Sequence, residues 1–465
     1  LSIRSLVRGG SSTLASDTPF HICIWYPDAP SIPRVLLSVK LGYYRRNLLA
    51  FMGDYVFFQV GMAFLNSTTV LPSLARQLTA STPLVGLIST MSSGLWMLPQ
   101  LVAANYVTGK PRKKPYLMLA AGVGRPFTWL FALLLFLGLG QYPLLLYGVF
   151  ILWVIIFWSC DGLASVPWFH LVSKTIPPER RGWLFGLGQT LGGVLAVGVG
   201  FIVRYLLGEQ GPPFPTNYAW LFMLGGAAFF ISLGSISMLK ETPEPASIDR
   251  SSWRAYLPKL VSLLRKDANF RLVTLVRLLL GAGGMAIPFY ILYATEDLGL
   301  STQAIGFFTS VQVGTSVLLG LLLGYLHERA GSKRVIQLGM VMALMAPVGA
   351  LLIPPLVSTR GSILLWSYAL VFIGLQGVMS SGMLGFMNFV METAPRAERP
   401  TYIGLANTLN AVQMIYPLLG GLLLKVISYP DLFIITALII GPGLLLTTRL
   451  REPRQEQLTE QEAPL

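Results

Sequence analysis

Four charged residues stand inside long apolar runs of the sequence: Asp54, Arg125, Asp161 and Arg277. A charged side chain in the middle of a bilayer costs about 2.5–3.5 kcal/mol even on the milder insertion scales. Such residues therefore need a partner of opposite charge or a water-filled cavity. The chemistry open to them is proton binding by a carboxyl group, neutralisation of an anionic solute, or a permanent salt bridge.

The two carboxylates have different expected roles. Asp161 could bind and release a proton if its charged neighbours change during a cycle, because such neighbours decide how tightly a carboxyl group holds a proton. The alternative for Asp161 is a permanent salt bridge, for instance to Arg125 or Arg277. For Asp54 we favour a salt bridge, since it lies near the start of its apolar run. Arg125 is expected to be structural, and Arg277 is left open between binding an anion and pairing helices.

Helical spacing groups other side chains with these charges. At 100° per residue, Asp161, Ser165 and Trp168 share one face of a helix. Arg277 lies on one stripe with two glycines and Pro288, which suits a moving helix with a kink. The other polar residues within apolar runs are candidate substrate contacts: Gln59, Asn66, Gln376, Asn407 and Asn410.

Long apolar segments must position these residues. Of the 465 residues, 54% are hydrophobic and 12% are charged, whereas soluble domains are about 25% charged. Runs of about 20 apolar residues that do not alternate predict membrane-spanning helices. By this criterion we expect twelve spans, at 47–70, 84–107, 115–138, 143–169, 183–207, 217–239, 270–294, 302–326, 334–356, 362–391, 402–427 and 430–449. This composition excludes a soluble enzyme, a nucleic-acid binder and a disulfide scaffold.

The positive charge of the chain indicates topology. Of its 34 lysines and arginines, 28 fall in the N-terminal tail, the loops after every second span and the C-terminal end. The positive-inside rule then predicts a plasma membrane protein of the bacterial inner membrane type, with both termini cytoplasmic. Its expected partners are anionic lipid headgroups rather than nucleic acid. The expected parts are a tail at 1–46, a six-helix half at 47–239, a cytoplasmic linker at 240–269, a six-helix half at 270–450 and a tail at 451–465.

The two halves repeat one another. The segments after the fourth and the tenth span share seven residues at a constant offset of 218, from Thr175 and Thr393 to Leu191 and Leu409. Two further matches have an offset of 220, and one of them is between the basic pairs Lys113-Lys114 and Lys333-Arg334. Parallel repeats of six helices are typical of one large class of secondary transporters.

At this point the sequence resembles the major facilitator superfamily. The loop motif of that family, roughly G-x-L-x-[DE]-R-x-G-x-[KR]-[KR], is well kept between spans 8 and 9. Its matching residues are Gly324, Glu328, Arg329, Gly331, Lys333 and Arg334. The resemblance implies that they form a cytoplasmic charge network that helps gate the transporter. In the degraded first copy, between spans 2 and 3, Thr108 stands where the family has an acidic residue.

The fold class we expect is therefore all-α and integral to the membrane, with twelve helices in two pseudo-symmetric halves. We find no metal-binding spacing, no cofactor motif and no Walker lysine, so we expect no enzyme, no metal and no cofactor. The expected function is transport of a small solute by alternating access, coupled to protons or another ion, by a chain that works as a monomer. The alternatives are a drug or metabolite efflux antiporter and a transport-inactive sensor on the same fold.

Overall fold

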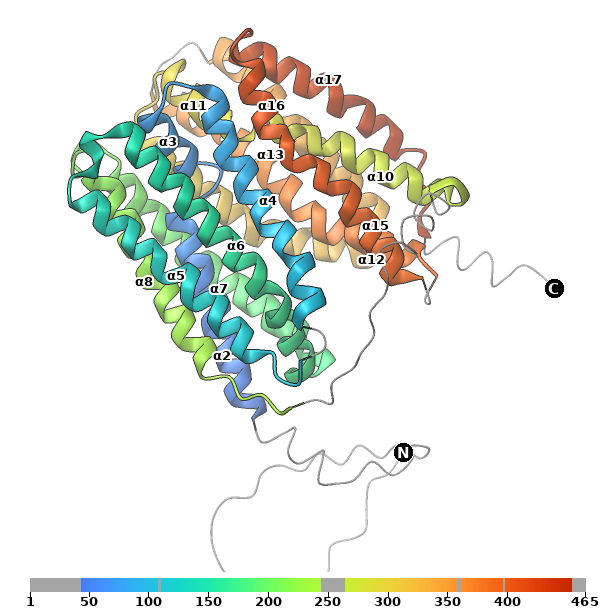
Figure 1. The fold of residues 1–465 in the computed structure, drawn as a ribbon. Helices are drawn as coiled ribbons and strands as arrows, with labels where there is room; N and C mark the ends of the chain where they lie inside the picture. Colours follow the sequence, from blue (N-terminus) through green and yellow to red (C-terminus); the bar gives the residue numbers. More distant parts are fainter. Residues whose placement is uncertain (1–42, 108–109, 244–263, 358–360, 396–397, 454–465) are drawn as a thin grey trace, which may run out of the picture. The chain divides into compact units, whose positions relative to one another are not determined.

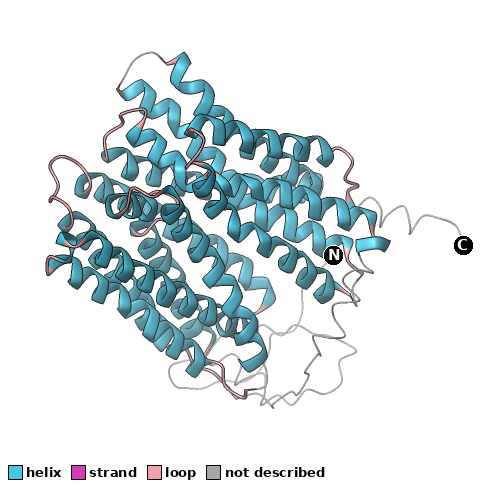
Figure 2. Cartoon of the chain, turned by 45° about the horizontal axis from the view of Figure 1, so that its top comes forward, coloured by secondary structure: helices cyan, strands magenta, loops and turns pink. Residues whose placement is uncertain are grey.

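The computed structural model of the chain describes residues 43–107, 110–243, 264–357, 361–395 and 398–453. Every secondary-structure element within these ranges is helical (Figure 2). The predicted tails lie almost wholly outside the described residues, as do most of the predicted linker and Thr108 of the first loop motif.

The first half of the chain forms a bundle that Figure 1 shows from blue to green. Its elements are α2 (Tyr44–Phe64), α3 (Val70–Leu78), α4 (Thr82–Val107), α5 (Lys114–Phe136), η1 (Leu139–Gln141), α6 (Pro143–Thr175), α7 (Pro178–Leu206) and α8 (Thr216–Ser237). Within this bundle α2 packs on α7 and α8, while α6 packs on α4 and α5.

The second half forms a bundle from yellow to red in the same view (Figure 1). Its elements are α10 (Ala268–Gly281), η2 (Ala282–Met285), α11 (Ile287–Glu296), α12 (Gln303–Leu356), α13 (Ser362–Ser381), η3 (Gly382–Met387), α14 (Asn388–Thr393), α15 (Arg399–Asn410), η4 (Ala411–Ile415), α16 (Tyr416–Leu423) and α17 (Tyr429–Thr447). The two halves meet where α7 packs on α12, α4 on α16 and α3 on α11.

Each of the twelve predicted spans corresponds to one or more of these helices. Three helical segments, α12, α4 and α15–α16, depart from the simple pattern of one long apolar helix for each span. Nine described helical stretches are long and apolar enough to cross a membrane. One of them, α12, is two helices that meet at Gly331, which has a non-helical backbone. The other two predicted spans correspond to α4 and to α15–α16, which are not among the nine. The fold is all-helical and built from two halves, as predicted.

The first predicted span is wrong at its C-terminal end. It was expected over 47–70, but α2 ends at Phe64 because the side chain of Asn66 accepts hydrogen bonds from the backbone N–H groups of Thr68 and Thr69. An Asn side chain that replaces a backbone acceptor in this way favours a turn over a helix. Asp54 consequently lies near the middle of its helix and not near the start.

Three helices of the second half are interrupted by turns of different geometry. A 3₁₀ segment, η2, separates α10 from α11, and another, η4, separates α15 from α16. The segment η3, between α13 and α14, is a π-helix. Such local changes of helix type recur at functional sites, and the kink predicted on the Arg277 stripe coincides with η2.

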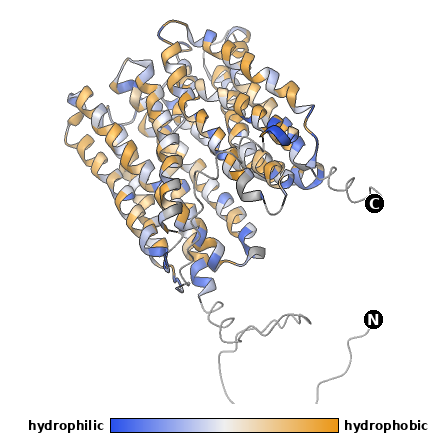
Figure 3. Ribbon diagram, turned by 45° about the vertical axis from the view of Figure 1, so that its right-hand side comes forward, coloured by the Kyte–Doolittle hydropathy of each residue, from blue (hydrophilic) through white to orange (hydrophobic). Residues whose placement is uncertain are grey.

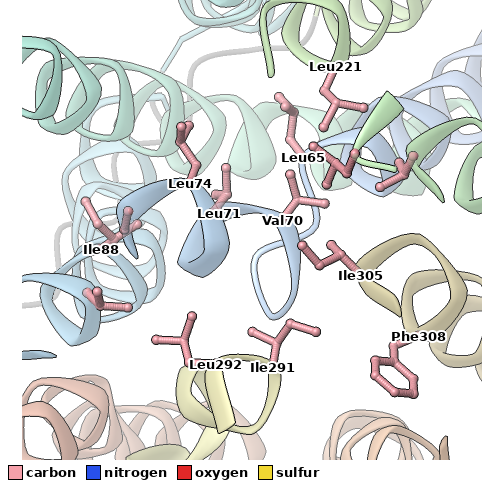
Figure 4. Packing of buried hydrophobic residues seen from close by; sticks show 14 of the residues in the cluster. Leu65, Val70, Leu71, Leu74, Ile88, Leu221, Ile291, Leu292, Ile305 and Phe308 are labelled. Atoms are coloured by element: carbon pink, nitrogen blue, oxygen red, sulfur yellow. The ribbon is translucent and has the colours of Figure 1, made fainter. Parts of the chain in front are cut away.

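The hydrophobic residues serve both as a core and as an outer surface. At the end of the bundle that carries α3 and α11, Val70 and Leu71 lie opposite Ile291 and Leu292 (Figure 4). Figure 3 shows hydrophobic residues along the helices and hydrophilic ones mainly near their ends. Large apolar side chains such as Leu144, 83% exposed, face outward. An exposed apolar surface of this extent is expected of helices surrounded by lipid.

Candidate functional site

Asp54 and Arg125 form a buried ion pair between α2 and α5. Arg125 Nη1 lies 2.9 Å from Asp54 Oδ1, and the side chains of Arg125 and Asp54 are 7% and 4% exposed respectively. Asp54 also accepts hydrogen bonds from Trp168 Nε1 at 2.7 Å and from Ser232 Oγ at 2.5 Å. Each charge of this pair thus has its counter-charge within the bundle, and the salt bridge favoured for Asp54 is formed. The structural role expected of Arg125 stays a prediction.

Asp161 lies about halfway along α6 and has a different environment. Its Oδ2 accepts a hydrogen bond from Trp96 Nε1 of α4 at 3.0 Å. Among the described residues no lysine, arginine or histidine forms an ion pair with it, although Arg125 and Asp54 are close enough to act on it electrostatically. The predicted alternative of a salt bridge to Arg125 or Arg277 is not formed in this conformation.

Close helix packing brings these groups together. A Cβ atom on Gly124 would lie 2.6 Å from Cβ of Cys160, so α5 and α6 touch beside Arg125 and Asp161. Of the face of α6 that was predicted from spacing, Trp168 contacts α2 through its hydrogen bond to Asp54, whereas Asp161 contacts α4. We call Asp54, Arg125 and Asp161 the charged cluster of the first half. It contains two carboxylates and one guanidinium.

Two predicted substrate contacts in the first half are engaged in other hydrogen bonds. Gln59 Nε2 donates to the carbonyl oxygen of Gly188 at 3.3 Å, which joins α2 to α7. Asn66 caps the turn after α2 and donates to Gln312 Oε1 of α12 at 3.2 Å. Their roles as substrate contacts stay predictions, and the structure gives each a second function in packing.

Arg277, Asn407 and Asn410, which were predicted separately as candidate site residues, come together in the second half. They line a cavity of about 80 Å³ with Thr274, Gly382 and Phe386. Gln376, on α13, is not among its lining residues and lies 3.4 Å from Ser380 Oγ. The sequence predicted these residue types but not the helix interruptions that bring them together.

The basic end of the bundle is the end at which α2 begins and α8 ends, and two glutamates organise it. Glu241, just after α8, accepts hydrogen bonds from the backbone N–H groups of Lys113 and Lys114 at 2.8 Å each. Its side chain is 3% exposed and lies 3.5 Å from Lys174 Nζ. A carboxylate at the N-terminus of α5 satisfies amide groups that have no partner within the helix.

Glu452, just after α17, has the equivalent place in the second half. It accepts a hydrogen bond from the backbone N–H of Lys333 at 2.9 Å. Gly331 makes this approach possible: its φ is +78°, and a Cβ atom there would lie 2.3 Å from Cδ of Glu452. Neither glutamate was among the residues predicted from the sequence. The signal that could have found them is the shared pattern Leu-Lys/Arg-Glu at the end of each half.

The other residues of the loop motif lie around this contact. Lys333 Nζ donates to the carbonyl oxygen of Thr448 at 3.1 Å, and the guanidinium of Arg329 lies over the ring of Tyr325 at 4.9 Å. Glu328 is exposed, Arg334 lies 3.5 Å from Gln337 Oε1, and a Cβ atom on Gly324 would meet open space. The gating role of the motif stays a prediction.

The opposite end of the bundle carries polar contacts between the two halves. Arg76 Nε lies 2.5 Å from Glu296 Oε1, and Tyr429 donates to the same carboxylate at 3.0 Å. Deeper in, Thr69 and Thr309 share a hydrogen bond of 2.7 Å. Thr82 Oγ1 donates to the carbonyl oxygen of Gly421 at 2.8 Å. These contacts hold α3 and α4 against the second half.

The described part of the chain holds no group of three or more His, Cys, Asp or Glu residues placed to bind a metal ion. The polar groups inside the bundle are therefore two separate sets. The charged cluster lies in the first half and the arginine cavity in the second. A carboxyl group without an ion partner can exchange a proton, and a guanidinium without one can bind an anion.

Comparisons with known proteins agree with this architecture. A family model described as the Major Facilitator Superfamily matches residues 55–413. The solved structure of a D-xylose–proton symporter is similar with a TM-score of 0.63 and 15% identity, over 90% of this chain and 98% of that chain. The peptide transporter POT in complex with sulfate gives a TM-score of 0.63 and 14% identity, over 90% and 97%. The nucleoside transporter NupG gives 0.60 and 16%, over 87% and 98%.

No curated protein sequence matches the chain. At identities this low, the structural likeness shows that the fold is shared.

Proposed function

The chain belongs to the Major Facilitator Superfamily, and from this premise we propose that it moves a small solute across a membrane by alternating access, with a proton as the coupling ion. In this mechanism the half at 47–239 would rock against the half at 270–450. The observation that carries the coupling proposal is the environment of Asp161. Its carboxyl group has a hydrogen bond to Trp96 and no ion partner among the described residues.

The charge balance of the first-half cluster supports proton binding. Two carboxylates and one guanidinium leave one negative charge when Asp54 and Asp161 are both ionised. An uncompensated charge inside a membrane is costly, so a proton on Asp161 would make the cluster neutral. We assign the proton to Asp161 because Asp54 already accepts three hydrogen bonds from side chains, one of them from its ion partner.

Arg125 supplies a means of coupling the proton to the conformational change. Its Nε is buried and has no hydrogen-bond partner within the described residues. When the helices shift, this free donor can turn to Asp161, and a guanidinium at that position would expel the proton. The proton would therefore bind in one state of the transporter and leave in the other.

The orientation of the chain in the membrane, its lipid contacts and its oligomeric state belong to the same proposal. We place the basic end on the cytoplasmic side of a bacterial inner membrane, because cytoplasmic loops carry an excess of lysine and arginine. This end would contact anionic headgroups, and the chain would act as a monomer with tails at 1–46 and 451–465 and a linker at 240–269. The cross-half contacts around Arg76 and Glu296 would then close the outer side.

The test is proton flux in proteoliposomes that contain a pH-sensitive dye. Wild-type protein is challenged with pooled sugars, amino acids, organic acids and cationic drugs, beside Asp161→Asn and the control Glu209→Gln, which removes an exposed carboxylate from a loop. We expect one pool to drive proton movement in the wild type and in Glu209→Gln but not in Asp161→Asn.

Three results would contradict parts of the proposal. Undiminished proton flux in Asp161→Asn removes Asp161 from the coupling step. Solute movement without protons in the wild type refutes proton coupling while leaving transport intact. If no labelled solute from any pool crosses, the transport proposal itself fails and the sensor alternative gains support.

A further inference from the structure

The cavity in the second half contains an arginine without a counter-anion, and this is the feature from which a substrate class follows. Arg277 forms no ion pair and no side-chain hydrogen bond among the described residues, and its Nε is buried. A buried cation without a partner is unfavourable, and it becomes favourable when an anion supplies the missing charge. A negatively charged group would supply the counter-charge that Arg277 does not receive from the described residues.

The position of the guanidinium is held by its neighbours. It lies over the ring of Phe386 at 4.8 Å and against the backbone of Gly382, where a Cβ atom would lie 2.9 Å from Nη1. Both residues belong to the π-helix η3. Stacking on an aromatic ring uses the face of a guanidinium and leaves its N–H edge available for an oxyanion.

Amide groups complete the same cavity. Asn410 accepts a hydrogen bond from Gln413 Nε2 at 3.2 Å, and Gln413 also donates to the carbonyl oxygen of Arg277 at 3.0 Å. Gln413 therefore orients the amide of Asn410 beside the arginine. The N–H₂ group of Asn410 is then left to donate to another partner. Asn407 is exposed on the same wall of the cavity.

We propose that Arg277, with Asn407 and Asn410, binds the oxyanion group of the transported solute, either a carboxylate or a phosphate. This inference rests on the proposed function, because it assigns the substrate class of that transporter. A cavity of about 80 Å³ accommodates such a group together with a small adjoining part of the solute. The two asparagine amides would bind its hydroxyl or carbonyl oxygens.

The binding test uses purified protein in detergent at constant ionic strength, with lactate, its neutral counterpart lactamide, and inorganic phosphate as probes. The readout is the shift of the thermal unfolding midpoint, because a ligand that binds the folded state raises it. We expect at least one of the two anions, and not lactamide, to raise the midpoint of the wild type. A response to lactate alone assigns a carboxylate, and a response to phosphate alone assigns a phosphate.

Two variants and one control make the test specific. Arg277→Gln should weaken anion binding at least about tenfold, since it removes the charged partner of a largely buried pair. Arg277→Lys should retain part of the binding, because lysine keeps the positive charge. It should not retain all of it, because lysine lacks the planar guanidinium group that donates two parallel hydrogen bonds. Arg204→Gln, which removes an exposed arginine at the end of α7, should bind as the wild type does.

The outcomes separate this inference from the transport proposal. Equal binding of lactate and lactamide, anion binding that survives in folded Arg277→Gln, or no shift with either anion overturns the inference. A neutral solute that drives flux equally in the wild type and Arg277→Gln would also overturn it, while leaving transport intact. Anion binding through Arg277 without flux of any solute would uphold the inference and refute transport.

Discussion

Glu241 and Glu452 hold equivalent positions in the two halves of the molecule. Each follows the last helix of its half, and each accepts a hydrogen bond from a backbone N–H group at the start of that half's third predicted span, which is α5 in the first half and the part of α12 after Gly331 in the second. The two contacts tie the end of each half back to its own loop motif. Glu241 thereby places a carboxylate at the basic end of the first half. The loop motif of this half has Thr108 where the family has an acidic residue.

We expect Glu241→Gln to lower the free energy of unfolding by about 1–3 kcal/mol, because it weakens hydrogen bonds to a buried charged group. The variant keeps the shape of the side chain but loses the charge that faces two amide groups and Lys174. The thermal unfolding midpoint in detergent measures the change, with Glu209→Gln as a control. An unchanged midpoint would show that this contact does not stabilise the first half.

Gly331→Ala should destabilise the second half. The backbone at Gly331 has φ +78° and ψ 177°, a region that residues with a Cβ atom enter at a cost of about 1–3 kcal/mol. The added methyl group would also displace the carboxylate of Glu452. Gly320→Ala is the matched control, since a Cβ atom there meets open space. Equal thermal midpoints for the two variants would contradict the prediction.

The ion pair between Asp54 and Arg125 should respond differently to single and double substitution. Arg125→Met leaves a buried carboxylate without its partner, which costs about 3–5 kcal/mol. Adding Asp54→Asn removes that charge and should restore most of the lost stability. The measurement is the fraction of monodisperse protein after mild heating. If the double variant is no more stable than Arg125→Met, the pair is not the source of the loss.

The ion pair between Arg76 and Glu296 should contribute only modestly to the stability of the conformation in which the two halves are in contact at this end. Both side chains are 29% exposed, and pairs of this kind contribute about 0.2–1 kcal/mol. We expect Arg76→Glu to slow solute uptake a few-fold, and the double variant Arg76→Glu, Glu296→Arg to recover at least half of the loss. Additive losses in the double variant would mean that the two residues act independently.

Much of the fold was predictable because membrane insertion leaves a clear pattern in a sequence. Apolar runs of about 20 residues and the bias in lysine and arginine follow from local composition, and the repeat at an offset of 218 is found by comparing two segments of the sequence. The residues with uncompensated charge inside these runs, such as Asp161 and Arg277, were found for the same reason. A charge in an apolar run is conspicuous wherever the chain places it.

What the sequence did not predict depends on contacts between distant segments. Arg125 pairs with Asp54 of α2 in this conformation although Asp161 of α6 is also near, and helical spacing within one span contains no information on that choice. The turn at Asn66 depends on its side chain accepting two backbone N–H groups, which shortened the first span. Glu241 lies outside every apolar run, so its burial could not be predicted from hydropathy.

The interruptions at η2, η3 and η4 have a mechanical consequence. All three fall in the second half, whereas α4, α5, α6, α7 and α8 of the first half run without a change of helix type. The two halves share a repeated sequence pattern but differ in where their described helices change type, and the second half has three such places. A π-helical turn holds an extra residue, so its relaxation to α-helix would rotate the segment beyond it by about 100°. Such a rotation would change the direction of α14 relative to α13 within the second half alone.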